Sequence, residues 1–137
     1  MKIIATVKNA GTLHHAAVGS PGGQRRIDVP AKASGHGSAV SGGEFLMLAL
    51  ATCYCNDIFR EAARLQIDVR GVEVVASPEF NGVGLAATNV TYQARVQADA
   101  PSEKLEQLLK ETDAVAEVHN TVRAPIAVTL VPWEEGA

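Results

Sequence analysis

Two cysteines, Cys53 and Cys55, are the side chains in this sequence whose chemistry suits nucleophilic or redox work. The thiolate is the nucleophilic form of cysteine, and it forms best where the side chain is partly exposed and close to positive charge. Two cysteines two residues apart are too few for a secreted disulfide scaffold. Both are therefore expected as free thiols in a reducing cytoplasm.

The two thiols project from nearly opposite sides of one predicted helix, which runs from about Ser41 to Leu65. A rotation of about 100° per residue prevents a bond between them unless the helix unwinds. The side of Cys55 is apolar along its whole length, which predicts a core thiol. The side of Cys53 is apolar before it and polar after it, where Asp57 and Arg60 follow. Cys53 is therefore the predicted reactive residue.

The start of this helix carries a capping-box pattern, with Ser41 as N-cap and Glu44 three residues later. The half from Phe45 to Cys55 is apolar on every side, so it needs more cover than one small sheet provides. A second copy of the chain would supply that cover. We therefore expect a homodimer.

The elements around the helix are predicted from hydrophobic period and turn signals. Several strands run together rather than alternating singly with helices, so the pattern predicts an α+β fold in a single domain, 1–137. The expected elements are a strand at Ile3–Val7, a hairpin within 11–23, a strand at Arg25–Val29, strands at 67–80 and 90–97, a second helix from Pro101 to Ala116, a closing strand at Ile126–Val131 and a disordered acidic tail at 134–137.

Composition excludes several classes of partner. The chain has 137 residues and a formal net charge of −3, so it has no basic footprint for nucleic acid or an anionic membrane. Its longest apolar run, 45–55, is shorter than the roughly 20 residues that span a bilayer. The N-terminus turns polar too early for a signal peptide. A soluble cytoplasmic protein is the expectation.

The segment Ser41-Gly-Gly-Glu-Phe-Leu-Met-Leu-Ala-Leu-Ala-Thr-Cys53, followed by a helical run and the strand start Leu65-Gln-Ile-Asp-Val-Arg-Gly-Val-Glu-Val, resembles the OsmC/Ohr family of osmotically inducible and organic hydroperoxide resistance proteins. The segments Arg26–Pro30 and His119–Leu130 support the resemblance. It implies antiparallel sheets with a long central helix and a second helix, assembled as an intertwined homodimer. It also implies a cysteine peroxidase that reduces organic hydroperoxides or hydrogen peroxide with a thiol reductant, and without a metal or cofactor.

The resemblance assigns the attacking cysteine to Cys53. Glu44 matches a carboxylate found at the helix start in part of the family, beside its simpler interpretation as a capping residue. The activating arginine of the family lies in the N-terminal hairpin, where this chain has His14 and His15, and one of them would replace it as a donor or general base. Ala116 stands where the family has its second cysteine, so the resolving thiol is absent.

Three functions remain open at this stage. The first is a one-cysteine thiol peroxidase, and the second is a catalytically altered dimer that holds a small apolar ligand near Cys53. The third is a zinc site formed by Cys53 with His14, His15 or His36, of which adjacent His14 and His15 face opposite sides of a strand. His119 is expected near the end of the second helix, where a cation is favourable.

Overall fold

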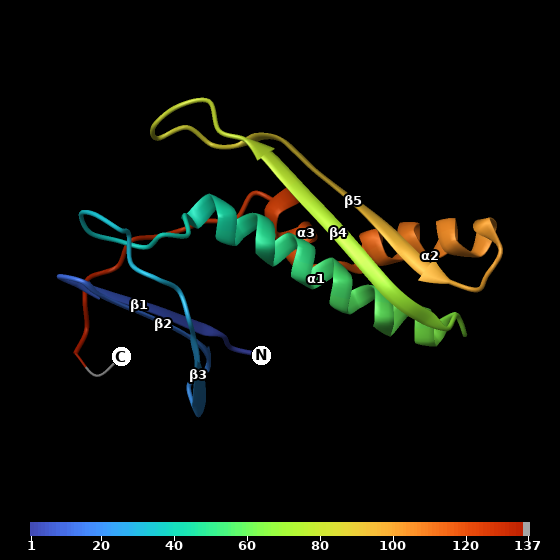
Figure 1. Ribbon diagram of the computed structural model, residues 1–137, viewed down its shortest axis with the longest axis horizontal. Helices are drawn as coiled ribbons and strands as arrows, with labels where there is room; N and C mark the ends of the chain where they lie inside the picture. Colours follow the sequence, from blue (N-terminus) through green and yellow to red (C-terminus); the bar gives the residue numbers. More distant parts are fainter. Residues whose placement is uncertain (136–137) are drawn as a thin grey trace. The chain divides into compact units, whose positions relative to one another are not determined.

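The computed structural model describes residues 1–135 and divides into two compact units, Met1–Leu46 and Met47–Ala137. The fold is α+β with antiparallel sheets, as predicted (Figure 1). The elements in chain order are β1 (Ile4–Ala10), β2 (Leu13–Ser20), β3 (Gly23–Ile27), α1 (Gly42–Arg64), β4 (Val69–Glu79), β5 (Thr88–Ala98), α2 (Ser102–Val115) and α3 (Glu117–Arg123).

The first unit is built on a three-stranded antiparallel sheet in the order β1-β2-β3. A two-residue turn joins β1 to β2, and Gly11 in its first central position has φ 60°, a conformation that glycine adopts without strain. Residues 11–23, predicted to contain a hairpin, instead form one strand, β2, between two turns, and β2 pairs with β1 on one side and with β3 on the other. The third strand begins two residues earlier than predicted, at Gly23, and ends at Ile27.

Helix α1 begins with the predicted capping box. The backbone N–H of Ser41 donates to Glu44 Oε1 at 2.9 Å, and the backbone N–H of Glu44 donates to Ser41 Oγ at 3.1 Å. These bonds satisfy amides that the first helical turn leaves free. The helix ends as Gln66 turns to φ 58° and the Ile67 N–H donates to the Ala62 carbonyl at 2.8 Å.

The core of the second unit lies where α1, α2 and the β4–β5 hairpin meet (Figure 1). Strands β4 and β5 are antiparallel, and inward residues such as Val72 and Val74 pack against the helices. Burial of this apolar surface is the main stabilising contribution here. The buried cluster contains Tyr54, Ile58, Ala62, Ile67, Leu108 and Ala116.

The prediction that Cys55 is a core thiol is wrong for the single chain. Cys53 packs against the buried cluster, whereas Cys55 is half-buried and lies outside it. On the side of Cys55, Leu48 is 59% exposed and Phe59 is 46% exposed. The apolar side of α1 therefore turns away from the core of its own chain.

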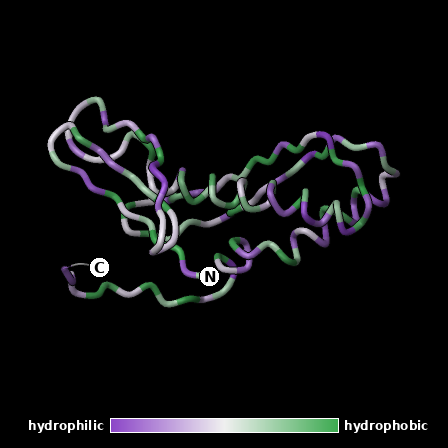
Figure 2. Tube along the Cα trace, turned by 90° about the horizontal axis from the view of Figure 1, so that it is seen from below, coloured by the Kyte–Doolittle hydropathy of each residue, from purple (hydrophilic) through white to green (hydrophobic). Residues whose placement is uncertain are grey.

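The predicted closing strand at Ile126–Val131 does not form. No strand of residues 1–135 pairs with this segment, although its side chains are strongly apolar (Figure 2). Leu130 is 98% exposed. A strand needs a neighbouring backbone for its hydrogen bonds, and an apolar pattern does not provide one. The predicted disordered tail extends to residues 136–137, which lie outside the described residues.

The predicted second helix is interrupted at Ala116, where the backbone is extended, with φ −71° and ψ 107°. A separate helix, α3, begins at Glu117. His119 consequently lies in α3 rather than near the end of α2, and it is buried, so its prediction as a cation at a helix end is wrong.

Among the described residues, no helix is sufficiently long and apolar to cross a membrane.

Candidate functional site

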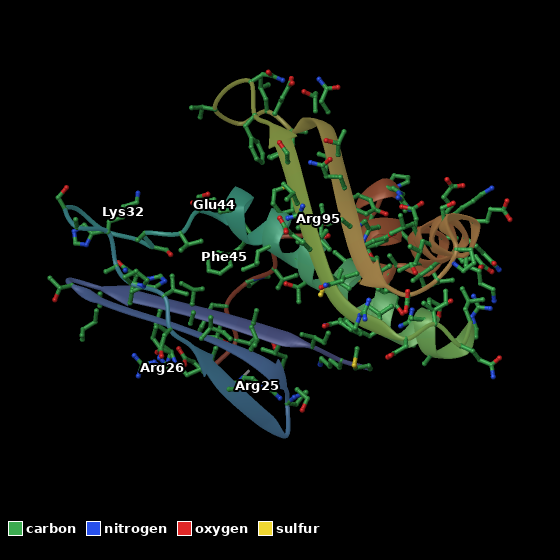
Figure 3. All side chains as sticks on the ribbon, turned by 45° about the vertical axis from the view of Figure 1, so that its right-hand side comes forward. Arg25, Arg26, Lys32, Glu44, Phe45 and Arg95 are labelled. Carbon is green, nitrogen blue, oxygen red and sulfur yellow. The ribbon has the colours of Figure 1, made fainter. Side chains whose placement is uncertain are left out.

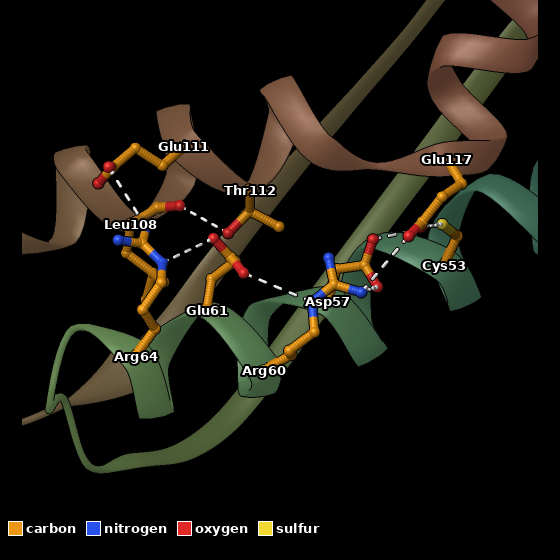
Figure 4. Close-up of polar contacts among 9 residues, drawn as sticks. All are labelled: Cys53, Asp57, Arg60, Glu61, Arg64, Leu108, Glu111, Thr112 and Glu117. Atoms are coloured by element: carbon orange, nitrogen blue, oxygen red, sulfur yellow. Dashed lines mark hydrogen bonds and ion pairs between the residues drawn. The ribbon is translucent and has the colours of Figure 1, made fainter.

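The thiol of Cys53 lies between two carboxylates (Figure 4). Cys53 and Asp57 are four residues apart on α1, a spacing that puts their side chains on one face. The Cys53 thiol donates to Asp57 Oδ2 at 3.6 Å. Glu117, from the start of α3, places Oε2 at 4.0 Å from Cys53 Sγ.

Arg60 joins the two carboxylates to each other. Its Nη1 lies 3.1 Å from Asp57 Oδ1 and 3.5 Å from Glu117 Oε1. We refer to Cys53, Asp57, Arg60 and Glu117 as the thiol cluster. Figure 4 shows that polar contacts continue from this cluster through Glu61 and Arg64 on α1 to Glu111 on α2. Thr112 donates separately to the Leu108 carbonyl within α2.

The electrostatics of the thiol cluster favour the protonated thiol. Burial raises the pKa of Cys53, and the carboxylates of Asp57 and Glu117 raise it further. Burial also raises the pKa of Asp57, whose side chain is only 9% exposed. A hydrogen bond with its own backbone lowers the pKa of the exposed Glu117 carboxyl. The thiol therefore needs a proton acceptor before its sulfur can attack.

An aromatic cluster formed by Tyr54, Tyr92 and His119 overlaps the core, to which Tyr54 belongs. The ring centroid of His119 is 4.5 Å from that of Tyr92 and 5.7 Å from that of Tyr54. Tyr54 donates to the Leu109 carbonyl at 2.7 Å, and burial raises its pKa to about 12. His119 is 3% exposed, and neither ring nitrogen has a hydrogen-bond partner in the described part of the chain.

Three residues predicted for the site belong to the first unit, whereas Cys53 belongs to the second. His14 is half-buried on β2, with Nδ1 at 3.1 Å from Asn9 Nδ2, and its neighbour His15 is exposed. Glu44 lies at the start of α1 (Figure 3), where the hydrogen bonds from Ser41 lower its pKa. These contacts account for Glu44 as a capping residue. The action of His14, His15 and Glu44 on Cys53 stays a prediction.

Cys53, Asp57 and Glu117 are a described group of residues whose potential metal-ligating atoms all lie within 4.8 Å of one another. A zinc site that combines Cys53 with His14, His15 or His36 stays a prediction, because these histidines belong to the first unit. Arg60 already forms ion pairs with both carboxylates, so a cation would have to compete with its guanidinium. We assign no metal to these residues.

Glu117 is the neighbour of Cys53 that sequence reasoning missed. Asp57 follows from helical spacing alone, whereas Glu117 reaches the thiol from 64 residues away. The break in the helix at Ala116 directs the Glu117 side chain towards the thiol. The sequence signal that could have found it is the resemblance that aligns Ala116 with the second cysteine of the OsmC/Ohr family. That resemblance implies that this part of the chain lies near Cys53, but it does not predict a carboxylate there.

Comparison with known proteins identifies relatives of this architecture. Residues 35–131 match the family described as OsmC-like protein. A search of curated protein sequences found no match.

Solved structures with the same fold are distant in sequence. An OsmC-like protein of unknown function from Vibrio cholerae is 17% identical with a TM-score of 0.61, covering 88% of this chain and 91% of its own. An organic hydroperoxide resistance protein OsmC from Legionella pneumophila is 15% identical with a TM-score of 0.60, covering 90% of each chain. An OsmC-like hydroperoxide resistance protein from Jannaschia sp. is 14% identical with a TM-score of 0.57, covering 98% of this chain and 94% of its own. The TM-scores show that these proteins share the fold of this chain.

Proposed function

Because this chain belongs to the OsmC-like family, we propose that it is a thiol peroxidase that reduces organic hydroperoxides or hydrogen peroxide through Cys53. The observation that carries the proposal is a half-buried free thiol beside a carboxylate able to accept its proton. Two proteins that share the fold are named hydroperoxide resistance proteins, which supports the choice of substrate.

The reaction follows a one-cysteine route. Cys53 attacks one peroxide oxygen, the O–O bond breaks, and the products are a sulfenic acid and an alcohol, or water when the substrate is hydrogen peroxide. A thiol reductant then displaces water from the sulfenic acid to form a mixed disulfide. A second thiol releases Cys53 and leaves as the reductant's disulfide. Ala116 provides no resolving thiol, and Cys55 projects from another side of α1.

The active form is proposed to be a homodimer. The apolar side chains of Leu48 and Phe59 on α1, and the apolar segment 126–131, are exposed in the single chain. A second copy would cover these surfaces, and the unpaired segment would gain a strand to pair with. The residues His14, His15 and Glu44 would approach Cys53 within that assembly. The cytoplasm is the proposed location, where thiol reductants are available.

The test is turnover of cumene hydroperoxide, tert-butyl hydroperoxide and hydrogen peroxide with dithiothreitol, followed by loss of peroxide. We expect turnover by the wild-type protein, none above the reductant's background by Cys53→Ser, and wild-type rates from the matched control Cys55→Ser. Undiminished turnover by Cys53→Ser would exclude the proposal.

A second function is favoured by the raised pKa of Cys53 and by the alanine at position 116. It is an OsmC-like dimer that holds a small apolar ligand near Cys53 without peroxidase turnover. Native mass spectrometry of the purified protein would reveal a copurified ligand, and alkylation kinetics would measure the thiol. A ligand together with a slowly alkylated thiol and no peroxide turnover would favour this function.

A further inference from the structure

The two oxygens of Asp57 have different partners. Oδ1 lies 3.1 Å from Arg60 Nη1, whereas Oδ2 accepts from the Cys53 thiol at 3.6 Å. The ion pair thus holds the carboxylate in place through one oxygen and leaves the other to receive a proton. We propose that Asp57 is a catalytic residue of the peroxide reaction, which takes the Cys53 proton as the sulfur attacks and returns it to the leaving oxygen. This inference rests on the proposed peroxidase function.

Asp57 fits this role better than the other carboxylate in the thiol cluster. The Glu117 side chain is 70% exposed and its oxygen is 4.0 Å from Cys53 Sγ, at the outer limit of a sulfur hydrogen bond. The Asp57 side chain is 9% exposed, so its interactions are weakly screened by water. Arg60 is a positioning residue that contacts both carboxylates.

Burial also improves Asp57 as a proton acceptor. A desolvated carboxylate binds a proton more strongly than one in water, which brings its affinity closer to that of the thiolate. Proton transfer between groups of similar affinity costs less free energy. The direction of the Asp57 pKa, raised by burial, agrees with this role.

The step is balanced without an external acid or base. The Cys53 S–H bond breaks and its proton moves to Asp57 Oδ2, while the sulfur electron pair forms a bond to the hydroxyl oxygen of the hydroperoxide. The O–O bond breaks, and its electron pair leaves on the alkoxide oxygen. Asp57 then protonates that oxygen, so that the thiol and hydroperoxide become sulfenic acid and alcohol, and Asp57 is again a carboxylate.

The pH dependence of the wild-type rate distinguishes this route from attack by a free thiolate. The route needs Asp57 ionised and Cys53 protonated. The rate of peroxide reduction should therefore be constant between the titration of Asp57 and that of Cys53, and fall at higher pH. A free thiolate would instead give a rate that rises with pH and levels off above the thiol titration, which is measured by absorbance at 240 nm. The other charged or titratable groups facing this pair are Arg60 and Glu61 on α1, and Glu117 and His119 on α3.

Asp57→Asn gives two effects of opposite sign. Loss of the negative charge lowers the pKa of Cys53, so alkylation by iodoacetamide at pH 7, measured in a Cys55→Ser background, should accelerate several-fold. Peroxide reduction should slow by about 100-fold or more, as expected for loss of a general acid–base group. A purely electrostatic role for Asp57 would accelerate both reactions.

The matched control is Asp113→Asn. Asp113 is also paired with an arginine, Arg123, and it accepts a hydrogen bond from Tyr92, whereas no hydrogen bond or ion pair among residues 1–135 joins it to the thiol cluster. The Asp113→Asn substitution should leave the rates of alkylation and of peroxide reduction within about twofold of wild type. Circular dichroism would establish that each variant is folded, and the wild-type pH profile needs no substitution.

The outcomes separate this inference from the proposed function. If Cys53→Ser retains turnover, the peroxidase function fails. If Cys53→Ser is inactive but Asp57→Asn matches or exceeds wild type, only the role of Asp57 fails. A loss in Glu117→Gln without a loss in Asp57→Asn would assign the proton to Glu117 and overturn the inference, as would a wild-type rate that rises with the thiol titration.

Discussion

Replacing His119 with phenylalanine is expected to stabilise the protein. The imidazole is 3% exposed and packs against Tyr54 and Tyr92, while its two nitrogens lack hydrogen-bond partners among residues 1–135. A buried polar group without a partner loses the hydrogen bonds that water makes to it in the unfolded chain. Phenylalanine keeps an aromatic ring in the same place and has no such groups to satisfy.

The magnitude follows from those two nitrogens. Neutral histidine has one donor and one acceptor, and each costs about 1–3 kcal/mol when buried without a partner. The larger ring strains its surroundings by about 1–3 kcal/mol, because the interior is close-packed. At the middle of each range, about 4 kcal/mol of relieved cost and about 2 kcal/mol of strain leave an expected net gain of about 2 kcal/mol in the free energy of unfolding of His119→Phe. With a urea dependence of about 2 kcal/mol/M, the midpoint rises by roughly 1 M.

The gain should increase on acidification. Burial lowers the pKa of His119, so the folded state holds the neutral ring while the unfolded chain gains a proton as pH falls through about 6.5. Wild-type stability therefore declines from pH 6.5 towards the lower folded-state pKa, and His119→Phe loses this part of the decline.

Urea unfolding followed by circular dichroism at pH 7.5 and pH 5.5 would measure both effects. His36→Gln, at an exposed histidine, is the control and should change stability by less than about 0.5 kcal/mol. A His119→Phe variant that is less stable than wild type at both values of pH, or that keeps the wild-type dependence on pH, would refute this account of the buried ring.

Four further substitutions test the architecture. Leu108→Ala removes a fully buried side chain and should cost about 3 kcal/mol of unfolding free energy in urea titrations. Leu130→Ala should leave the circular dichroism spectrum unchanged but weaken the proposed dimer in sedimentation experiments, because Leu130 is exposed in the single chain. Ser41→Ala removes the capping hydroxyl and should cost about 1 kcal/mol, with faster amide exchange in the first turn of α1. Ala116→Cys, at the position that resembles the second cysteine of the family, should form a disulfide with Cys53 after one equivalent of peroxide. Mass spectrometry would detect it as the loss of two hydrogens, absent in Cys53→Ser.

The elements that sequence reasoning predicted well are those governed by local interactions. The capping box of Ser41 and Glu44 and the uninterrupted run of helix formers define α1, and alternation of side chains predicts β5. The helical spacing of Cys53 and Asp57 likewise places them on one face before any tertiary contact forms. The family resemblance drew on the same local segments, which is why it was confirmed.

Tertiary structure decided which helix face is the core. Leu48 and Phe59 are as apolar as the buried residues of α1, and composition alone does not say which side meets the sheet. The prediction of Cys55 as a core thiol failed for this reason. Apolar character favours burial in general, but the surface that provides it depends on chain topology and assembly.

Long-range placement also set the chemistry of the thiol. The spacing of residues along α1 brings Asp57 to Cys53, but the break at Ala116 brings Glu117 to the sulfur and His119 into the aromatic cluster. Local sequence patterns determined the main helices and strands and the identity of the candidate nucleophile. The burial of that thiol and its second carboxylate neighbour, Glu117, depend on contacts between distant segments, because electrostatic interactions follow distance in space rather than along the chain.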